Sequence, residues 1–525
     1  MAYIKSLHIE GFKKFKKLDI IFNENMNILV GENEAGKSTI LNAIKTVLNQ
    51  QYKNVDKSII KELLNSENIN TFKNNPSIKT LPRIYIEMDL NLDPKDSNAE
   101  YFFGEHNIDK TGKFGISFTC EFDKELGTDL IEEINKGKIP YEYYNLNWIT
   151  FRGKPYQMIK KPFGFIAIDT SNNDTQSSFN YFNKSLFASK YNENIKMKAK
   201  NSFREKVDEA FEFIDLPKID ENRKFGIDSK KIVLEAVLSV FENDISLENH
   251  GSGMENLIKT QIALDKSKSG LDVVLIEEPE SHLSFLNLRK MINEIANKKE
   301  TSQIIISTHD NLIASGLNLK NVFWITSNNV ISLSNVEDKV ANFFVKASDN
   351  SFLQLLLSDK AILVEGATEC ILLPKFYEQI TERKIEEDGI AIIPCNGVAY
   401  KNYLKVVANT NKKIAVLTDN DKSSDKLKFA VKFNNISSSQ KIFMGTSVVD
   451  EWTWEACLYK DNKDKLTSII KVNNSSKYLF HNEDYGPILG KMLNNKAEVA
   501  YQILISDEKF VVPKYVEEAI LWLNE

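Results

Sequence analysis

The stretch GENEAGKS, Gly31–Ser38, decides the first half of the fold. It matches the phosphate-loop pattern of two glycines, a lysine and a hydroxyl residue at fixed spacing. The residues ahead of it, Met26–Val30, form a short apolar run typical of a strand, and Thr39–Leu48 behind it predicts a helix. A strand, a glycine-rich loop and a helix in this order predict a phosphate-binding site in an α/β domain.

The chemistry of this loop indicates a nucleoside triphosphate. Lys37 would meet the β- and γ-phosphates, the Ser38 hydroxyl would ligate one Mg²⁺, and the helix N-terminus adds a favourable dipole. The alternative is a chance match, which the flanking strand and helix argue against. The residues that we predict to bind ATP here are Gly31, Asn33, Gly36, Lys37, Ser38 and Thr39.

A second strand, Val273–Ile276, ends in the paired carboxylates Glu277 and Glu278. Glu277 is placed to join the Mg²⁺ shell, and Glu278 to polarise the attacking water. The alternative is a buried strand with a solvated acidic end. With the phosphate loop in the same chain, we favour the catalytic interpretation.

Two further motifs belong to the same hypothesis. His309 follows a strand and would contact the γ-phosphate, although a lone histidine is more often structural. Ser252 and Gly253 lie in a Gly/Ser turn before a predicted helix, which suits an anion. The alternative for that turn is a simple helix-capping loop.

A second acidic centre follows near residue 360. Glu365 ends the predicted strand Ala361–Val364, and Glu369 lies four residues on, in the first turn of a helix. Asp419 and Asp421 end a later strand. Because parallel strands place their carboxyl ends on one edge, these four groups should converge. Carboxylates without His or Cys favour Mg²⁺ or Mn²⁺, and two such ions suit phosphodiester cleavage. The alternative for each pair alone is a solvated strand end.

Composition excludes some classes. The chain has 525 residues, a formal net charge of −6, 42% hydrophobic and 27% charged residues, and four scattered cysteines. It is not histone-like, although a local basic face remains compatible with DNA. We read no membrane span, no signal peptide and no zinc spacing, which predicts a cytoplasmic protein with reduced thiols and no membrane partner.

Strand and helix patterns alternate, which predicts parallel sheets in both halves. Ile4–Glu10 and Leu18–Phe22 suggest a hairpin, Ser171–Asn180 reads as a loop, and Asn201–Ile214 and Lys230–Phe241 read as helices. We expect an α/β protein with four parts: 1–174, the first part of an ATPase head; 175–245, a helical dimerisation insertion; 246–350, the rest of the head; and 351–525, a nuclease domain.

The order of motifs in the first 350 residues resembles an ABC-type ATPase head of the SMC kind. The resemblance implies that Ser252 and Gly253 form the signature motif, which completes the ATP site of a second subunit in a head-to-head dimer. The sequence departs from the family by its His-Gly-Ser-Gly turn and by Glu277 where Asp is common.

The C-terminal set resembles the Toprim fold, and a head followed by a Toprim domain resembles the OLD (overcoming lysogenization defect) nuclease family. The resemblance implies that Glu455 and Lys496 complete the catalytic set of Glu365, Glu369, Asp419 and Asp421. Glu451 and Asp450 are rivals for the former, and Lys491 for the latter. It also implies an ATP-regulated DNA endonuclease in antiphage defence, forming a dimer or tetramer. The family's partners include a helicase-like protein, as for the Gabija nuclease subunit, or a retron reverse transcriptase with its DNA–RNA product.

Two other functions fit parts of the sequence. One is an SMC- or RecF-like DNA-repair ATPase whose Toprim-like domain only binds DNA, which the clustered carboxylates argue against. The other is a Toprim topoisomerase or primase. A topoisomerase also needs a DNA-gate domain, for which this chain has no room. A primase normally adds a zinc module, which the cysteine spacing excludes.

Overall fold

The computed structural model divides the chain into two compact units, Met1–Asn335 and Val336–Glu525. It describes the chain except residues 126–129, 170–174, 213–216, 218, 224, 226–232, 266–269, 299–301, 327–328, 347–350, 396–398, 409 and 473–477, and except the side chains of 175–180, 211–212 and 298. None of the helices in the described part is long and apolar enough to cross a lipid bilayer.

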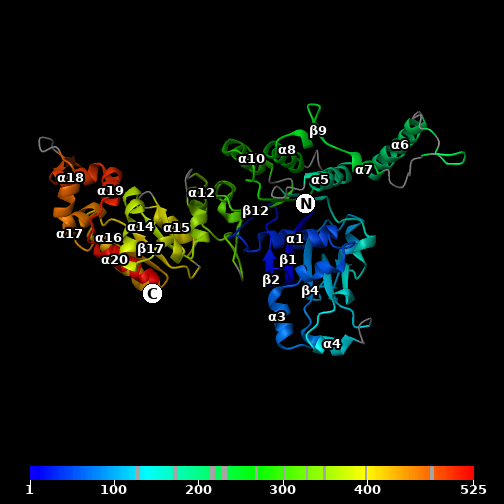
Figure 1. Cartoon of the computed structure of the whole chain (residues 1–525), viewed down its shortest axis with the longest axis horizontal. Helices are drawn as coiled ribbons and strands as arrows, with labels where there is room; N and C mark the ends of the chain where they lie inside the picture. The colour runs from blue at the N-terminus through cyan, green and yellow to red at the C-terminus, as the bar shows by residue number, and fades with distance from the viewer. Residues whose placement is uncertain are drawn as a thin grey trace. The chain divides into compact units, whose positions relative to one another are not determined.

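The first unit contains an antiparallel sheet in the order β2-β1-β4-β6-β5, with β7 pairing β6 (Figure 1). The predicted hairpin is confirmed, because Ile9 of β1 pairs with Leu18 of β2. The strands are β1 Tyr3–Phe12, β2 Phe15–Ile21, β4 Ile84–Asn91, β5 Phe103–Gly104, β6 Lys113–Phe122 and β7 Tyr144–Thr150.

The second sheet of this unit has the order β14-β13-β3-β12-β11-β8, and all its pairings are parallel except β13 with β14. Its continuous apolar runs are typical of strands buried on both faces. The strands are β3 Met26–Val30, β8 Phe165–Asp169, β11 Val273–Glu277, β12 Gln303–Thr308, β13 Val322–Ile325 and β14 Val330–Ser332.

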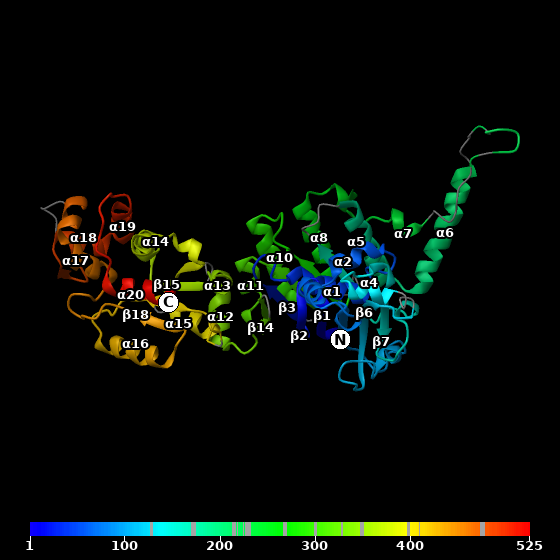
Figure 2. The ribbon, with the colours of Figure 1, turned by 60° about the horizontal axis from the view of Figure 1, so that its bottom comes forward.

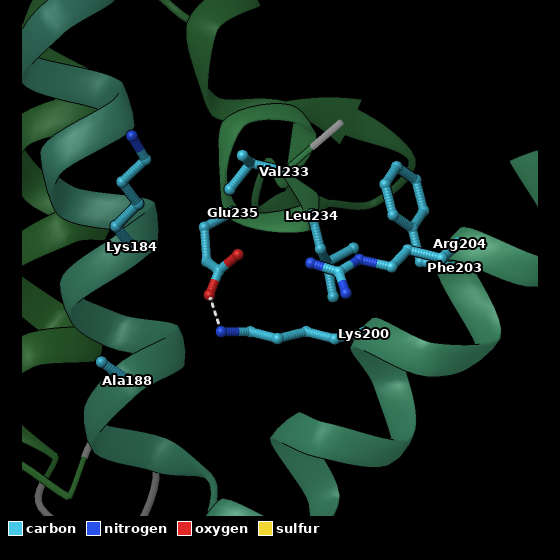
Figure 3. Close-up of a pocket in the computed structure, with 8 residues that line it drawn as sticks. All are labelled: Lys184, Ala188, Lys200, Phe203, Arg204, Val233, Leu234 and Glu235. Atoms are coloured by element: carbon cyan, nitrogen blue, oxygen red, sulfur yellow. Dashed lines mark ion pairs between the residues drawn. The ribbon is translucent and has the colours of Figure 1, made fainter. Parts of the chain in front are cut away.

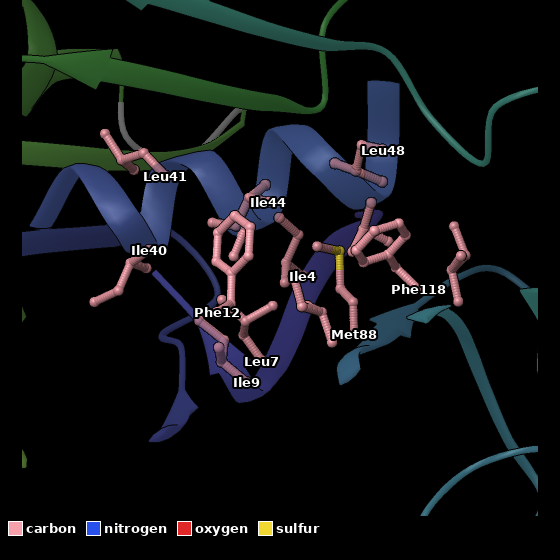
Figure 4. Packing of buried hydrophobic residues seen from close by; sticks show 14 of the residues in the cluster. Ile4, Leu7, Ile9, Phe12, Ile40, Leu41, Ile44, Leu48, Met88 and Phe118 are labelled. Atoms are coloured by element: carbon pink, nitrogen blue, oxygen red, sulfur yellow. The ribbon is translucent and has the colours of Figure 1, made fainter. Parts of the chain in front are cut away.

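Helix α1, Lys37–Asn49, contacts strands of both sheets. Its apolar residues recur at helical spacing and lie against the antiparallel sheet (Figure 4). Ile44, for example, packs in one fully buried cluster with Ile4 and Phe118. This core fixes the helix that follows the phosphate loop. The other helices of the unit are α2 Ile60–Leu63, α3 Ser66–Asn74, α4 Ile131–Asn135, α5 Thr175–Lys190, α6 Glu193–Glu212, α7 Leu234–Val237, α8 Ser252–Leu264, α10 Phe285–Lys298 and α11 Asn311–Gly316.

The region between β8 and α8 differs from the sequence-based expectation. The predicted loop Ser171–Asn180 is wrong from Thr175, where α5 begins, and 171–174 lie outside the described residues. Of the predicted helix over Lys230–Phe241, only α7 is helical among the described residues. Residues 230–232 lie outside the described part. Helix α7 is followed by a short hairpin of β9, Phe241–Glu242, and β10, Ile245–Ser246. Figure 2 shows α6 extending away from both sheets of the unit.

The second unit is built on a parallel sheet with the order β16-β15-β17-β18. The strands are β15 Lys360–Val364, β16 Ile390–Pro394, β17 Ile414–Leu417 and β18 Gln440–Phe443, and a short hairpin adds β19 Leu479–Phe480 and β20 Glu483–Asp484. The helices are α12 Asp338–Lys346, α13 Phe352–Leu357, α14 Ala367–Thr381, α15 Tyr400–Val406, α16 Ser424–Ile436, α17 Trp454–Ile469, α18 Pro487–Asn494, α19 Lys496–Leu504 and α20 Lys514–Asn524. The expected α/β class with a parallel C-terminal sheet is confirmed.

Candidate active sites

The parallel sheet of the first unit brings the nucleotide motifs to one edge. Strand β12 lies between β3 and β11, with Val30 opposite Thr308 and Ile276 opposite Ile306. The phosphate loop follows β3, Glu277 ends β11 with Glu278 directly after it, and His309 follows β12. Three motifs that are far apart in the sequence therefore share the carboxyl edge, where such sheets bind ligands.

The phosphate loop has the backbone that its glycines predict. Gly36 has a φ of 109°, and a Cβ there would lie 2.4 Å from Cζ of Phe15. Lys37 is buried, and its Nζ donates to the carbonyls of Gly31 at 2.7 Å and Glu32 at 3.0 Å. Burial lowers the pKa of Lys37, which Glu278 opposes. The ammonium is thus held over the loop. Of the other predicted contacts, Thr39 is buried, whereas Asn33 and Ser38 are exposed.

Glu277 is a buried carboxylate balanced by lysines. Its Oε2 lies 3.5 Å from Nζ of Lys45 on α1. Burial and the nearby Lys45 lower the pKa of Lys13, and the charge of Glu277 opposes that shift. Sequence reasoning did not select either lysine, because their approach to Glu277 depends on how α1 and the loop after β1 pack.

Glu280 is an acidic residue of this edge to which sequence reasoning gave no role. It accepts hydrogen bonds from Thr308 Oγ1 at 2.8 Å and from the backbone N–H of His309 at 2.9 Å, and it lies 3.2 Å from Nδ1 of His309. Burial raises the pKa of Glu280. His309 Nδ1 also lies 3.9 Å from Glu278, whose φ of 48° is unusual for a residue with a side chain. The structure therefore brings His309 and Glu278 together, and Glu280 holds His309 through its backbone and its ring. In the sequence, only the position of Glu280 directly after Pro279 points to it.

The Gly/Ser turn starts α8. Gly251 precedes its first residue, Ser252, and a Cβ on Gly253 would lie 2.3 Å from the carbonyl oxygen of His282, so only glycine fits there. Among the described residues, no hydrogen bond or ion pair joins Ser252 or Gly253 to the phosphate loop. Their role toward ATP would need a second copy of the chain and stays a prediction.

The second acidic site lies on the carboxyl edge of the C-terminal sheet. Strands β15 and β17 are neighbours, with Leu363 opposite Val416. Glu365 follows β15 and accepts from the hydroxyl of Thr418 and from the backbone N–H of Asp419 at 2.9 Å. The predicted meeting of the two strand ends is confirmed. Thr418 was not predicted to take part.

Helix N-termini supply the next two carboxylates. Glu369, in the first turn of α14, accepts from the N–H of Gly366 at 3.2 Å. Glu455 lies in the first turn of α17, and Thr368 Oγ1 donates to it at 3.4 Å. The N–H of Trp454 donates to Asp419 Oδ1 at 2.9 Å, which ties α17 to β17.

These carboxylates are crowded and withdrawn from water. The exposed fractions are 6% for Glu369, 8% for Asp419 and 2% for Glu455. Burial, and then the charges of Glu365, Glu455 and Glu369, raise the pKa of Asp419 well above its ordinary value. Burial raises the pKa of Glu369 to about 7, with the charges of Glu455 and Glu365 adding to it. The crowded carboxylates of this cluster therefore favour the binding of a positively charged group.

Lys496 supplies one positive charge. Its Nζ lies 3.1 Å from Glu455 Oε2. Burial lowers the pKa of Lys496, but Glu455, Asp419 and Glu369 outweigh burial and raise it overall. Its rival Lys491 instead donates to the carbonyl of Lys471 at 2.8 Å. The geometry thus favours Lys496 as the lysine of this cluster.

Asp421 is held differently from the other predicted ligands. It is exposed, forms an ion pair with Lys426, and has a φ of 50°. Its backbone N–H donates to the carbonyl of Trp452 at 3.1 Å. Glu365, Glu369 and Asp419 act on one another electrostatically, while the side chain of Asp421 is engaged by Lys426. Its role as a metal ligand stays a prediction.

The rivals of Glu455 serve other purposes. Glu451 accepts from Thr446 N and Ser447 N and pairs with Lys460 at 2.8 Å, and these bonds, Lys460 first, lower its pKa to about 2. It holds a loop. Asp450 is exposed. Glu455, in contrast, faces the other carboxylates.

The donor set fits a hard divalent cation, because it consists of carboxylate oxygens that repel one another in a buried place. In the parts of the chain that the structure describes, no three His, Cys, Asp or Glu side chains already stand close enough to hold a metal ion.

Comparisons with known proteins agree with both halves. A family model described as "AAA domain, putative AbiEii toxin, Type IV TA system" matches residues 26–315. A model of the "Overcoming lysogenization defect protein-like, TOPRIM domain" matches residues 356–421. The chain thus belongs to the AAA domain family, and its ATPase head followed by a Toprim domain makes it an OLD-family protein.

Individual proteins and one solved structure match parts of the chain. The Old nuclease of Escherichia phage P2 is 23% identical over 452 residues, which cover 75% of this chain and 73% of that protein. The chromosome partition protein Smc of Fusobacterium nucleatum is 47% identical over 55 residues, covering 10% of this chain and 5% of the relative. Among solved structures, an Smc head with an extended coiled coil from Pyrococcus furiosus is 14% identical, covers 65% of this chain and 100% of its own, and has a TM-score of 0.35.

Proposed function

We propose that the chain is an ATP-regulated endonuclease that uses divalent cations to hydrolyse phosphodiester bonds in DNA. The observation that carries this proposal is the buried cluster of Glu369, Asp419 and Glu455 beside Glu365. Such a cluster is costly to a fold unless cations compensate it, since like charges out of water destabilise one another.

The residues would divide the work as follows. Glu365, Glu369, Asp419 and Glu455 would hold two Mg²⁺ or Mn²⁺ ions through their carboxylate oxygens. The bound ions would supply an activated water and charge neutralisation for the leaving oxygen. Lys496 would stabilise the negative charge that develops on the phosphate, as a point charge next to the site.

The first unit would bind ATP with one Mg²⁺. Lys37 would leave the carbonyls of Gly31 and Glu32 for the β- and γ-phosphates. Glu277 would join the Mg²⁺ shell, and Glu278 would orient water with His309 beside it. Ser252 and Gly253 would act on the ATP of a second copy in a head-to-head dimer, and a tetramer would pair two such dimers.

Plasmid nicking tests this function. Supercoiled DNA with Mg²⁺ or Mn²⁺ should be nicked or linearised by the wild type. Glu365→Ala and Asp419→Ala should lose the activity, whereas Asp450→Ala, a nearby exposed carboxylate, should keep it. Cleavage by both of the first two variants would refute the site.

A second candidate is an SMC- or RecF-like DNA-repair ATPase whose Toprim-like domain only binds DNA. One observation favours it: Asp421 is engaged by Lys426 rather than by the cluster. The plasmid nicking assay distinguishes the two candidates, because a protein that only binds DNA leaves the plasmid intact with every cation.

The proposed setting is antiphage defence in the cytoplasm, with a helicase-like protein or a retron reverse transcriptase and its DNA–RNA product as the partner. The support is the resemblance to the OLD family. Cells that express the wild type should reduce phage plaques more than cells that express Asp419→Ala. Equal plaque counts would contradict this setting.

A further inference from the structure

Helices α5 and α6 of the first unit border two neighbouring cavities. One cavity, of 880 Å³, lies between α5 and the segment around Lys160–Phe165. The other, of 460 Å³, lies between α5, α6 and α7 (Figure 3). Lys184 and Ala188 line both cavities, and their spacing of four places them on one face of α5. The two cavities therefore adjoin along this face.

The lining of these cavities is basic. Four carboxylates face seven cations, which leaves a formal balance of +3 in a chain whose net charge is −6. The carboxylates are Asp96, Glu193, Glu235 and Asp272. The cations are Lys160, Lys161, Lys184, Lys190, Lys196, Lys200 and Arg204, and we call the surface that they line the basic groove.

The cations of α6 repeat at helical spacing. Lys196, Lys200 and Arg204 follow one another every four residues, about 6 Å apart along the helix axis. Like charges at this spacing disfavour a helix. Two of them have partners. Lys196 pairs with Glu193 at 2.6 Å. Lys200 pairs with Glu235 at 2.5 Å, which Figure 3 shows. Arg204 is exposed. The row suits an extended anion that runs along the helix.

Lys184 lies on the side of the groove opposite α6. In Figure 3 it extends from α5, across the cavity from Lys200 and Arg204 on α6. It is exposed, as is Arg204. Cations that face each other across a groove and repeat along it match a chain of phosphates better than a single phosphate, which a compact glycine-rich cradle would hold.

We propose that the basic groove binds the phosphodiester backbone of DNA. This inference rests on the proposed function in taking DNA as the substrate, and it assigns the contact to α5, α6 and the segment around Lys160, away from the carboxylate cluster in the sequence. Contacts of lysine and arginine with phosphate give affinity without sequence preference and make binding depend on salt.

Binding is measured by fluorescence anisotropy of a short labelled DNA duplex in EDTA, where no cleavage interferes. The double variant Lys184→Glu/Arg204→Glu should bind at least roughly tenfold more weakly, with a slope of log affinity against log salt reduced by about 2. The control Lys53→Glu/Lys79→Glu reverses two exposed lysines of the same unit that do not line the groove, and it should bind like the wild type. Lys184→Gln/Arg204→Gln gives a milder version of the test.

The outcomes are distinguishable. Unchanged affinity and salt slope in both groove variants would overturn the inference, even if the wild type cuts plasmid. A changed oligomeric mass by light scattering that accompanies the loss of binding would also overturn it, because the groove would then join two copies of the chain. Weaker binding at unchanged mass supports the inference even if the wild type fails to cut, a result that would count against the proposed function alone.

Discussion

Lys496 Nζ lies 3.1 Å from Oε2 of Glu455, although 41 residues separate them in the chain. Glu455 is almost fully buried, whereas the lysine side chain is 45% exposed. The ammonium therefore meets the carboxylate cluster from the solvent side, where a phosphate would also approach.

Lys496→Ala should destabilise the second unit in the absence of divalent cations. Removing one partner of a fully buried pair costs about 3–5 kcal/mol, and the exposure of this lysine reduces our expectation to about 1–2 kcal/mol. Chemical denaturation in EDTA measures it. Lys491→Ala, which removes a nearby lysine outside the cluster, should cost less. Equal losses would show that Lys496 has no special relation to Glu455.

Divalent cations should stabilise the protein more at pH 8 than at pH 5. The folded-state pKa of Glu369, raised to about 7, exceeds its ordinary value of 4.5, so the folded state binds more protons between these values. Without cations, stability should therefore fall as pH rises through this window, by at most about 1.4 kcal/mol per pH unit for one such proton. Added Mn²⁺ should reverse the fall.

Thermal unfolding at several pH values, with and without Mn²⁺, checks this. Glu369→Gln cannot ionise, so its stability in EDTA should depend less on pH than that of the wild type. An identical pH dependence in the two proteins would contradict the assignment of the raised pKa to Glu369.

Asn420→Ala should loosen the loop that carries Asp421. Asn420 is fully buried, and its Nδ2 donates to the carbonyls of Gly445, Ser447 and Glu451. Removing the amide that donates to these carbonyls should cost about 2–4 kcal/mol, although the Ser447 carbonyl keeps the N–H of Glu451 as a donor. Denaturation reports this loss, and ATP binding should be unaffected. Asn435→Ala, at an exposed position of α16, serves as the control, and an equal effect of the two changes would contradict the account.

Lys37→Ala should abolish ATP binding, because the lysine supplies the only side-chain cation within the loop Gly31–Ser38. Isothermal titration with ATP and Mg²⁺ measures this. Lys53→Ala should bind as the wild type does. Retained affinity in Lys37→Ala would show that the loop does not hold the triphosphate.

Much of both sites follows from strand ends. Glu365, Asp419, Glu277 and His309 could be predicted because each lies at or just past the end of a strand with an apolar run, and parallel strands place such residues on one edge. Glu455 and Lys496 needed the family resemblance, since their approach depends on how α17 and α19 pack.

Other features were beyond sequence reasoning. Asp421 was expected in the cluster, but its left-handed backbone and Lys426 direct its carboxylate elsewhere. The sequence predicts a loop over the first six residues of α5, 175–180, because they are mostly polar. The helical state of α5 depends on tertiary contacts, such as the bond of 2.7 Å between Asn49 Nδ2 and Tyr181 OH. Local propensity is a weak guide where packing decides.

Binding of divalent cations by the buried carboxylates of the second unit can be counted by electron paramagnetic resonance of Mn²⁺, titrated without nucleotide. We expect bound Mn²⁺ in the wild type and in Lys37→Ala, and its loss in Asp419→Asn, which keeps the shape of the side chain. Undiminished Mn²⁺ binding by Asp419→Asn, or none by the folded wild type, would contradict this expectation.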